Sequence, residues 1–395
     1  MNILFFHDHP IVATDGGISR ITDSLVGIFR NYGHNVFIIS AKKRPNVKVD
    51  EKHFYLPNSK YDDECLSFAI HFCKEHKIDL IISQSSDKIS VPFWGKLKEN
   101  VPIKLFSYMH NCPLTPVVNY AYQKEFVLRR KKLTPIFYLL KNKIIKKVLL
   151  ILYYIKYRNL YTEIANVSDR VLVLNGKLVK EFQFFIPKNL YSKITAVPNC
   201  LPMREWNSNV QKEKILLWVG RIDVSVKRID LMLNAWRLLY KTNPGWKLYV
   251  LGDGSYLDWA KNFAEANNLK NIFFEGRVDP YPYYEKASLV AVTSSHESFS
   301  LVTLEALQHN VVPVVMNSFP FASTLIQNGV NGILVENYNY ESLANALDML
   351  MKNERMIENI ATNGTCSALK YSPQCIYDGC WAKLLILNFQ SKLSL

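Results

Sequence analysis

Two glutamates, Glu297 and Glu305, lie eight positions apart, and a helical sequence pattern begins between them. Carboxylates accept hydrogen bonds from hydroxyl groups, while the backbone amides at a helix N-terminus favour phosphate. A ligand with hydroxyls at both ends and a diphosphate between them, such as a sugar-nucleotide, matches this arrangement. The alternative is an ordinary helix start with one solvated glutamate, and the segment alone does not exclude it.

A second candidate site follows the predicted strand 214–219. Gly220 permits a tight exit from the strand, and Arg221 and Lys227 flank the turn that leads to the next predicted helix. A guanidinium fork and an ammonium point charge can converge on a diphosphate, whereas the alternative is two solvated cations on a surface turn. The chain has no G-x-G-x-x-G after a strand and no Walker-type loop, which argues against dinucleotide and P-loop sites.

Residues in the first half of the chain follow predicted strands in a similar way. Gly16 and Gly17 come after the apolar strand 3–6, and His110 comes after the strand 103–108. The carboxyl ends of strands in open parallel sheets face the ligand crevice, so these residues are candidates for ligand contact. A plain turn and a structural histidine are the alternatives. The Gly252-Asp253-Gly254 segment is interpreted only as a turn.

Strands and helices alternate through both halves of the chain. The first series of predicted strands covers 3–6, 36–40, 80–83, 103–108 and 171–174, and the second covers 214–219, 247–251, 272–275, 289–292, 311–315 and 332–335. This alternation of strands and helices is typical of parallel sheets with helices on both faces. The sequence therefore predicts an α/β protein with two Rossmann-like domains, 1–200 and 201–372, a linker near 199–211 and a C-terminal helix over 373–395 that crosses back to the first domain.

The amino-acid composition excludes several classes of protein. The 395 residues are 49% hydrophobic and 21% charged, which indicates a globular chain, and its seven cysteines form no C-x-x-C pair. A disulfide framework or a zinc site is therefore not expected, and a reducing, cytoplasmic location is favoured. The N-terminal apolar run is too short for a signal peptide, and no run reaches the length that spans a bilayer. No metal cluster is evident.

The net charge of +14 is concentrated in one segment, 124–158, which holds eleven Lys or Arg residues and one acid, Glu125. From Lys143 to Ile155 the pattern is helical, with an apolar stripe and a basic side. A basic amphipathic helix suits an anionic membrane surface, and the predicted contacts are Arg129, Arg130, Lys131, Lys132, Lys143, Lys146 and Lys147. The alternative is a domain helix whose stripe is core and whose lysines are solvated. No nucleic-acid-binding motif accompanies the charge, so no nucleic-acid partner is expected.

The order of motifs in the second half resembles glycosyltransferase family 4, a retaining family of GT-B fold with two Rossmann-like domains facing a cleft. The resemblance is strongest from Lys214 to Val335. It rests on an ordered series of short motifs: Gly220-Arg221 with Lys227, Leu251-Gly252-Asp253-Gly254, Phe274-Glu275-Gly276, Ala287-Ser288, Glu297 with Glu305-Ala306, and Asn328-Gly329-Val330-Asn331-Gly332.

The resemblance implies a role for each site residue. Arg221 and Lys227 would bind the donor diphosphate, Glu297 and His110 the donor sugar, and Glu305 the ribose. The remaining donor contacts would come from Gly16, Gly17, Gly220, Ser300, Leu301 and Val302. Catalysis would need no metal or other cofactor, because cationic side chains would stabilise the leaving nucleotide of a UDP- or GDP-sugar co-substrate.

The chain departs from the family pattern at two positions that are usually glycine, Arg228 and Ser300. These departures bear on the donor-sugar contacts more than on the fold. The expected function is hexosyl transfer to a glycan, lipid-linked if the membrane interpretation holds, in lipopolysaccharide or capsule synthesis on the inner face of the cytoplasmic membrane. A GT-B sugar-nucleotide epimerase and a non-catalytic membrane-attached binding module are the alternatives.

Overall fold

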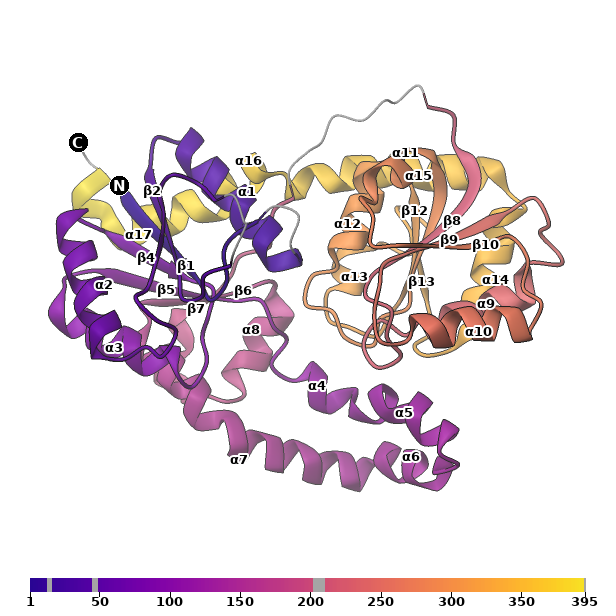
Figure 1. Ribbon diagram of the computed structural model, residues 1–395, viewed down its shortest axis with the longest axis horizontal. Coiled ribbons are helices and arrows are strands. Elements are labelled where there is room, and N and C mark those ends of the chain that lie inside the picture. Colours follow the sequence, from indigo (N-terminus) through magenta and orange to yellow (C-terminus); the bar gives the residue numbers. More distant parts are fainter. Residues whose placement is uncertain (13–15, 45–48, 202–209, 394–395) are drawn as a thin grey trace. The chain divides into compact units, whose positions relative to one another are not determined.

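The computed structural model describes residues 1–12, 16–44, 49–201 and 210–393. Within these residues the chain forms two compact units, and each is built on one parallel β-sheet (Figure 1). Unit 1 comprises Met1–Pro113, Leu152–Pro202 and Tyr371–Leu395, and unit 2 comprises Leu114–Ile151 and Met203–Lys370. The prediction of an α/β protein with two parallel sheets is confirmed. Most of the predicted linker, residues 202–209, lies outside the described residues.

The sheet of unit 1 has the strand order β3-β2-β1-β4-β5-β6-β7. Its central strands are apolar on both faces, as parallel sheets covered by helices require; Leu80, Ile81 and Ile82 of β4 are fully buried. The strands are β1 (Asn2–His7), β2 (Asn35–Ser40), β3 (His53–Tyr55), β4 (Leu80–Ser83), β5 (Lys104–Met109), β6 (Arg170–Val173) and β7 (Ile194–Ala196). The three-residue edge strands β3 and β7 were not predicted.

Helices cover both faces of this sheet. The α2 and α3 side chains pack against Leu4 and Phe6 of β1, while Phe5 points the other way and meets Phe29 of α1 with ring centroids 5.7 Å apart. The helices of unit 1 are α1 (Gly17–Asn31), α2 (Asp63–Glu75), α3 (Ser90–Asn100), the second half of α7 (Lys143–Val167), α8 (Gly176–Gln183) and the short η1 (Lys188–Lys193).

The C-terminal tail packs on the α1 side of unit 1. Instead of the single predicted helix it forms α16 (Pro373–Ile376), a π-helical turn η3 (Tyr377–Trp381) and α17 (Ala382–Leu393). Tyr377 stacks on Tyr32 with ring centroids 3.7 Å apart, and Trp381 lies edge-on to Phe29 at 5.1 Å. The extra residue of the π turn brings both aromatic side chains of η3 onto α1.

The sheet of unit 2 has the order β10-β9-β8-β11-β12-β13. Helices α9, α10 and α14 cover one face and α11 and α12 the other (Figure 1). The strands are β8 (Glu213–Val219), β9 (Lys247–Leu251), β10 (Ile272–Gly276), β11 (Ala287–Val292), β12 (Val312–Met316) and β13 (Ile333–Val335). The helices are α9 (Ile229–Leu239), α10 (Leu257–Ala266), α11 (Tyr281–Lys286), α12 (Leu301–Gln308), α13 (Ala322–Leu325), α14 (Tyr340–Met351), α15 (Glu354–Ala368) and the short η2 (Leu369–Tyr371).

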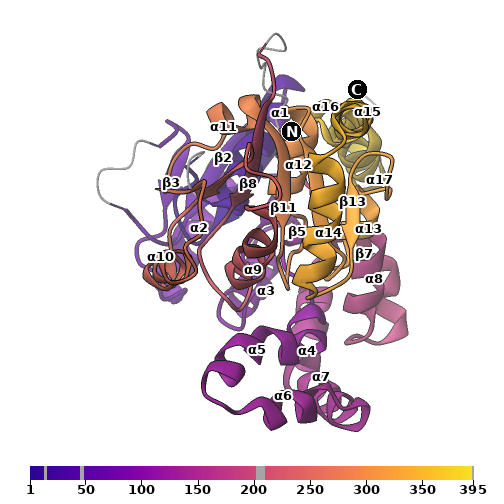
Figure 2. The ribbon, with the colours of Figure 1, turned by 90° about the vertical axis from the view of Figure 1, so that its right-hand side faces the viewer.

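The segment Leu114–Ile151 belongs to unit 2, whereas the sequence placed it in a first domain of residues 1–200. It forms α4 (Thr115–Val118), α5 (Tyr120–Arg130), α6 (Thr134–Lys141) and the first part of α7, with α4, α5 and α6 next to one another (Figure 2). Aromatic contacts cause the grouping: Tyr122 stacks on Tyr338 at 3.8 Å, and Phe126 lies edge-on to Trp259 at 4.7 Å. These partners are distant in sequence, so local patterns could not reveal them.

Candidate functional site

The loop between β8 and α9 is organised by one buried carboxylate, Asp223. Its Oδ1 accepts hydrogen bonds from the backbone N–H groups of Ser225, Val226 and Lys227 at 3.1, 2.6 and 2.9 Å. An Asp side chain that satisfies consecutive amides in this way fixes a turn. Asp223 is not among the predicted site residues, although an Asp two residues before a Ser in a strand–helix loop is a recognisable turn signal.

The glycines after β9 are more than a turn, which corrects the sequence interpretation. A Cβ atom on Gly252 would lie 1.9 Å from the carbonyl oxygen of Gly220, and one on Gly254 would lie 2.4 Å from that of Ile222. The backbones are also hydrogen-bonded, since the Ile222 N–H donates to the Asp253 carbonyl at 2.9 Å. Positions 252 and 254 must therefore be glycine for the loop after β9 to pack against the loop after β8.

Lys227 forms an ion pair with Glu297. The Lys227 ammonium donates to Glu297 Oε1, which also accepts a 2.8 Å hydrogen bond from Ser294 Oγ. The Lys227 and Glu297 side chains are 23% and 14% exposed, so the pair is largely shielded from water. Thr293 Oγ1 donates to the Lys227 carbonyl at 2.7 Å. The structure thus brings together two predicted site residues that are 70 positions apart.

Helix α12 begins beside Glu297. Ser300 is its N-cap residue and has a left-handed backbone with φ of 60°, and Arg228, the N-cap of α9, has φ of 55°. Both departures from the family pattern therefore occupy backbone conformations that favour glycine. Leu301 and Val302 form the first turn of α12, whose amides have no partners within the helix.

The two remaining predicted donor contacts of unit 2 lie in contrasting environments. Glu305 is buried, at 1% exposed, and its Oε2 accepts a 3.1 Å hydrogen bond from the Tyr284 hydroxyl. The Arg221 side chain is 65% exposed, and its Nε donates to Asp223 Oδ2 at 2.9 Å. Arg221 thus shares the carboxylate that organises the loop but does not touch Lys227 through any contact recorded among the described residues.

The predicted residues of unit 1 end up at the carboxyl ends of its strands. His110 follows β5, is buried, and pairs through Nε2 with Oε1 of Gln84, which follows β4. Burial lowers the pKa of His110 to about 3, so the imidazole is neutral near pH 7. Gly16 is the N-cap of α1 with φ of 41°, and Gly17 is its first residue.

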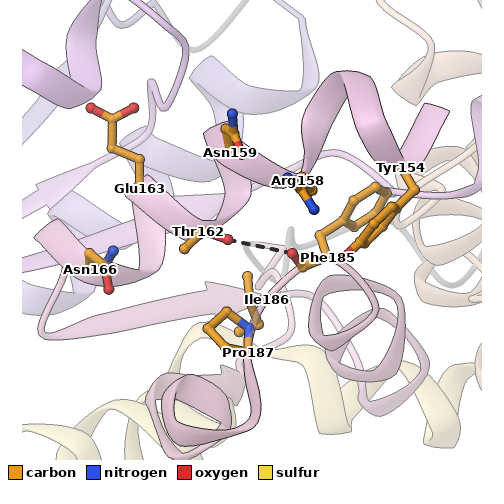
Figure 3. A pocket seen from close by; sticks show the side chains of 9 residues that line it. All are labelled: Tyr154, Arg158, Asn159, Thr162, Glu163, Asn166, Phe185, Ile186 and Pro187. Atoms are coloured by element: carbon orange, nitrogen blue, oxygen red, sulfur yellow. Dashed lines mark hydrogen bonds between the residues drawn. The ribbon is translucent and has the colours of Figure 1, made fainter. Parts of the chain in front are cut away.

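A cavity of about 470 Å³ lies between the second half of α7 and residues 185–187 (Figure 3). Asn159, Thr162 and Glu163 line it from the helix, and Thr162 donates to the Phe185 carbonyl at 3.5 Å. This part of α7 leads into the start of β6, so the cavity lies at the amino ends of the strands. His110 lies at the carboxyl ends, where ligands of such sheets bind, so the cavity is not part of the predicted site.

The basic segment presents its apolar stripe to solvent. Ile144, Val148, Ile151 and Ile155 are 71, 47, 57 and 60% exposed, and the buried residues of α7 all lie from Tyr161 onward. The alternative in which this stripe is core is therefore wrong. Further exposed apolar side chains extend the same segment: Leu133, Ile136, Tyr138, Leu139 and Leu152. Among the described residues, no helix is both long and apolar enough to cross a membrane.

The second half of the chain is similar to a known protein family. Residues 203–366 match the family model described as glycosyl transferases group 1. The match lies within unit 2 and contains the Lys227–Glu297 pair. In the part of the chain that the structure describes, no group of three or more His, Cys, Asp or Glu side chains is placed to hold a metal ion.

Several curated relatives are named as glycosyltransferases. An uncharacterised glycosyltransferase of Haemophilus influenzae is 31% identical over 147 residues, which cover 37% of this chain and 41% of that protein. The poly(glycerol-phosphate) alpha-glucosyltransferase of Bacillus subtilis is 29% identical over 220 residues, which cover 55% of this chain and 32% of that protein. The matched region therefore spans less than half the length of either relative. The amylovoran biosynthesis glycosyltransferase AmsD of Erwinia amylovora is 22% identical over 378 residues, which cover 92% of this chain and 95% of that protein.

Solved structures show the fold. HepE of Anabaena, solved with UDP and glucose, aligns with a TM-score of 0.71 at 15% identity over 97% of this chain and 99% of HepE. A TarM variant of S. aureus, solved with UDP, fondaparinux and alpha-GlcNAc-glycerol, aligns with the same TM-score, identity and coverage. The chain has the GT-B fold of these proteins, as predicted.

Proposed function

We propose that this protein is a retaining glycosyltransferase of family 4 that transfers a hexose from a UDP- or GDP-sugar to a glycan acceptor. The observation that carries the proposal is the Lys227–Glu297 pair, held by the Asp223 loop beside the start of α12. A cation, a carboxylate and helix amides within one short region suit a ligand that joins a diphosphate to a sugar. The group 1 family match over this region supports the same ligand class.

In the proposed reaction, negative charge develops on the departing nucleotide next to cationic side chains of unit 2. As the bond between the sugar C1 and the diphosphate oxygen breaks, negative charge grows on the departing nucleotide. Lys227 would stabilise this charge, and Glu297 would then accept hydrogen bonds from the sugar hydroxyls. The acceptor oxygen attacks C1 from the same face, as family membership implies, and its proton passes to the departing diphosphate.

Arg221 and Glu305 complete the proposed donor site. The Arg221–Asp223 pair is largely exposed on the arginine side, and exposed ion pairs contribute at most about 1 kcal/mol, so the guanidinium can turn toward a diphosphate at little cost. Glu305 is held by Tyr284 and would accept from the ribose hydroxyls. The neutral His110 of unit 1 would make a hydrogen bond to the donor sugar rather than contribute a charge.

The proposed acceptor is lipid-linked, and the proposed place of work is the inner face of the cytoplasmic membrane. Two observations support this: the apolar stripe of α7 is exposed, and the segment 124–158 holds eleven cations against one acid. Each cation near an anionic bilayer contributes about 1 kcal/mol, so several together give reversible attachment. Two relatives are named for polymer chemistry, poly(glycerol-phosphate) glucosylation and amylovoran biosynthesis, which supports a role in a cell-surface glycan such as lipopolysaccharide or capsule.

A donor screen tests the enzymatic part of the proposal. Binding of UDP, GDP and ADP is measured by calorimetry, and each sugar-nucleotide that binds is then incubated with and without a lipid-linked glycan extract. The proposal predicts nucleotide release that the acceptor stimulates, with the new glycosidic bond in the donor's configuration. Release of a free, altered sugar without acceptor dependence would instead indicate an epimerase, and nucleotide binding without turnover would indicate a binding module.

Vesicle co-sedimentation tests the membrane part. Vesicles containing about 30% phosphatidylglycerol should bind the protein and release it in high salt, because charge attraction is screened. Changing Lys143, Lys146 and Lys147 together to Glu should abolish binding. A matched triple change of Lys241, Lys247 and Lys261 to Glu, at exposed positions of unit 2 outside the basic segment, should leave it intact. Equal loss in both triple variants, or equal binding to neutral vesicles, would contradict this account.

A further inference from the structure

We infer that α5 and the turn before it are part of the donor site, with Asn119 and Glu125 as positioning residues for Glu297 and Lys227. Neither residue lies in the segment 203–366 that matches the family model. Both belong to the segment Leu114–Ile151, which comes from the first half of the sequence but packs in unit 2. The inference rests on the proposed function, because it assigns these residues to the same donor site.

Asn119 joins the two backbone segments that surround Glu297. Its side chain is buried, and its amide nitrogen donates to the carbonyl oxygens of Ser295 and Ser318, both at 2.7 Å. Ser318 Oγ in turn donates to the carbonyl of Ser294, whose own hydroxyl holds Glu297 Oε1. The Asn119 side-chain amide therefore holds the segment that carries Glu297 and the segment after β12 in fixed positions relative to each other.

Glu125 acts on the other partner of the pair through Arg228, the residue that follows Lys227. The Arg228 side chain is 2% exposed and donates to the Tyr122 carbonyl at 3.0 Å, to Glu125 at 3.2 Å and to Asp230 at 2.9 Å. The α5 helix thus supplies two of the groups that hold this guanidinium. Because Arg228 has a left-handed backbone, its side-chain contacts help to fix the end of the Lys227 loop.

The two anchors are connected through the site itself. Ser295 N–H donates to the Val226 carbonyl at 2.7 Å, and Ser295 Oγ donates to the Ser225 carbonyl at 2.5 Å. A shift of the segment released by Asn119 would therefore also move the loop that ends at Lys227. Buried carbonyls that lose their donor must find another, so the two segments would rearrange when Asn119 is removed. Such a rearrangement would displace Glu297 and Lys227 in the empty site and so weaken donor binding.

Donor kinetics separate a positioning role from a merely structural one. Asn119→Ala and Glu125→Ala are compared with Gln123→Ala on the same helix, and thermal unfolding is recorded for each. A structural role would lower the unfolding temperature and the active fraction, and thus kcat, while leaving donor KM unchanged. Positioning predicts that donor KM and the nucleotide Kd rise about tenfold in both variants, equivalent to about 1.4 kcal/mol. Glu125→Gln, which keeps an acceptor for Arg228, should restore most of the affinity.

The outcomes distinguish this inference from the proposed function. If wild-type protein binds no nucleotide, the proposed function fails. If wild-type protein is active and donor KM in folded Asn119→Ala stays within twofold of wild type, only the positioning inference is overturned. Should Asn119→Ala not fold, the comparison of Glu125→Ala with Glu125→Gln decides: equal donor KM in these two variants overturns the inference, and a clear difference supports it.

Discussion

Lys227→Ala is the most informative single substitution, because it removes the cation proposed to stabilise the departing nucleotide. Losing one such preorganised group typically lowers kcat by about 10²–10³-fold, or about 2.7–4 kcal/mol. A second effect acts on Glu297, which is 14% exposed and would lose its ammonium partner while keeping the hydrogen bond from Ser294. Some loss of stability is therefore expected alongside the loss of rate.

A double variant separates these two effects. Lys227→Ala combined with Glu297→Gln leaves no uncompensated charge, so its unfolding temperature should return toward wild type while turnover stays low. Lys214→Ala is the matched control, since Lys214 also pairs with a glutamate, Glu354 at 2.9 Å, but with side chains 55% and 70% exposed. That pair should contribute little to stability and nothing to turnover.

The assay is nucleotide release at saturating donor and acceptor, with thermal unfolding measured on the same preparations. We expect wild-type rates for Lys214→Ala and a loss of at least about a hundredfold for Lys227→Ala. A folded Lys227→Ala protein whose kcat lies within threefold of wild type would refute the assignment of Lys227 to the departing diphosphate.

Three further predictions follow from local structure. Gly252→Ala would place a methyl group 1.9 Å from a carbonyl of the facing loop, so it should cost about 1–3 kcal/mol in urea unfolding and weaken donor binding. Asp223→Ala leaves three backbone amides without their acceptor and should raise donor KM, while Asp223→Asn, which keeps one oxygen, should be milder. Burial lowers the pKa of His34 and His53 to about 4 and that of His110 to about 3. Below pH ~6.5 the unfolded chain therefore binds more protons, and the free energy of unfolding should fall between pH ~6.5 and ~4; a constant urea midpoint over this range would contradict it.

The sequence predicted those parts of the fold that depend on continuous local patterns. Buried strands such as β4 and β12 are apolar on both faces, so their sequence runs identify them and their alternation with helices identifies parallel sheets. The resemblance carried by the ordered motifs of unit 2 implied that Lys227 and Glu297 contact one donor molecule, which stays a prediction. Their ion pair was not itself foreseen, since the distance between two loops is set by the sheet rather than by sequence spacing.

The parts that sequence reasoning missed depend on contacts between distant residues. Asn119 lies 176 and 199 positions from its two carbonyl partners, and no local periodicity encodes such a link. The grouping of α5 with unit 2 arises from the same cause. The sequence alone indicates only a turn at Gly252 and Gly254, because the constraint on these glycines comes from the loop after the neighbouring strand β8. For the basic segment 124–158, sequence periodicity alone could not distinguish an exposed apolar stripe from a core stripe, because the distinction depends on what packs against it.

We propose that Lys227, with Arg221, binds the donor diphosphate in unit 2 while Glu305 holds the ribose. A crystal structure of the protein with a sugar-nucleotide that it turns over tests this most directly. We predict a diphosphate oxygen within hydrogen-bond distance of Lys227 Nζ and a ribose hydroxyl on the Glu305 carboxylate. A nucleotide bound away from Lys227 and Glu305 would contradict the account.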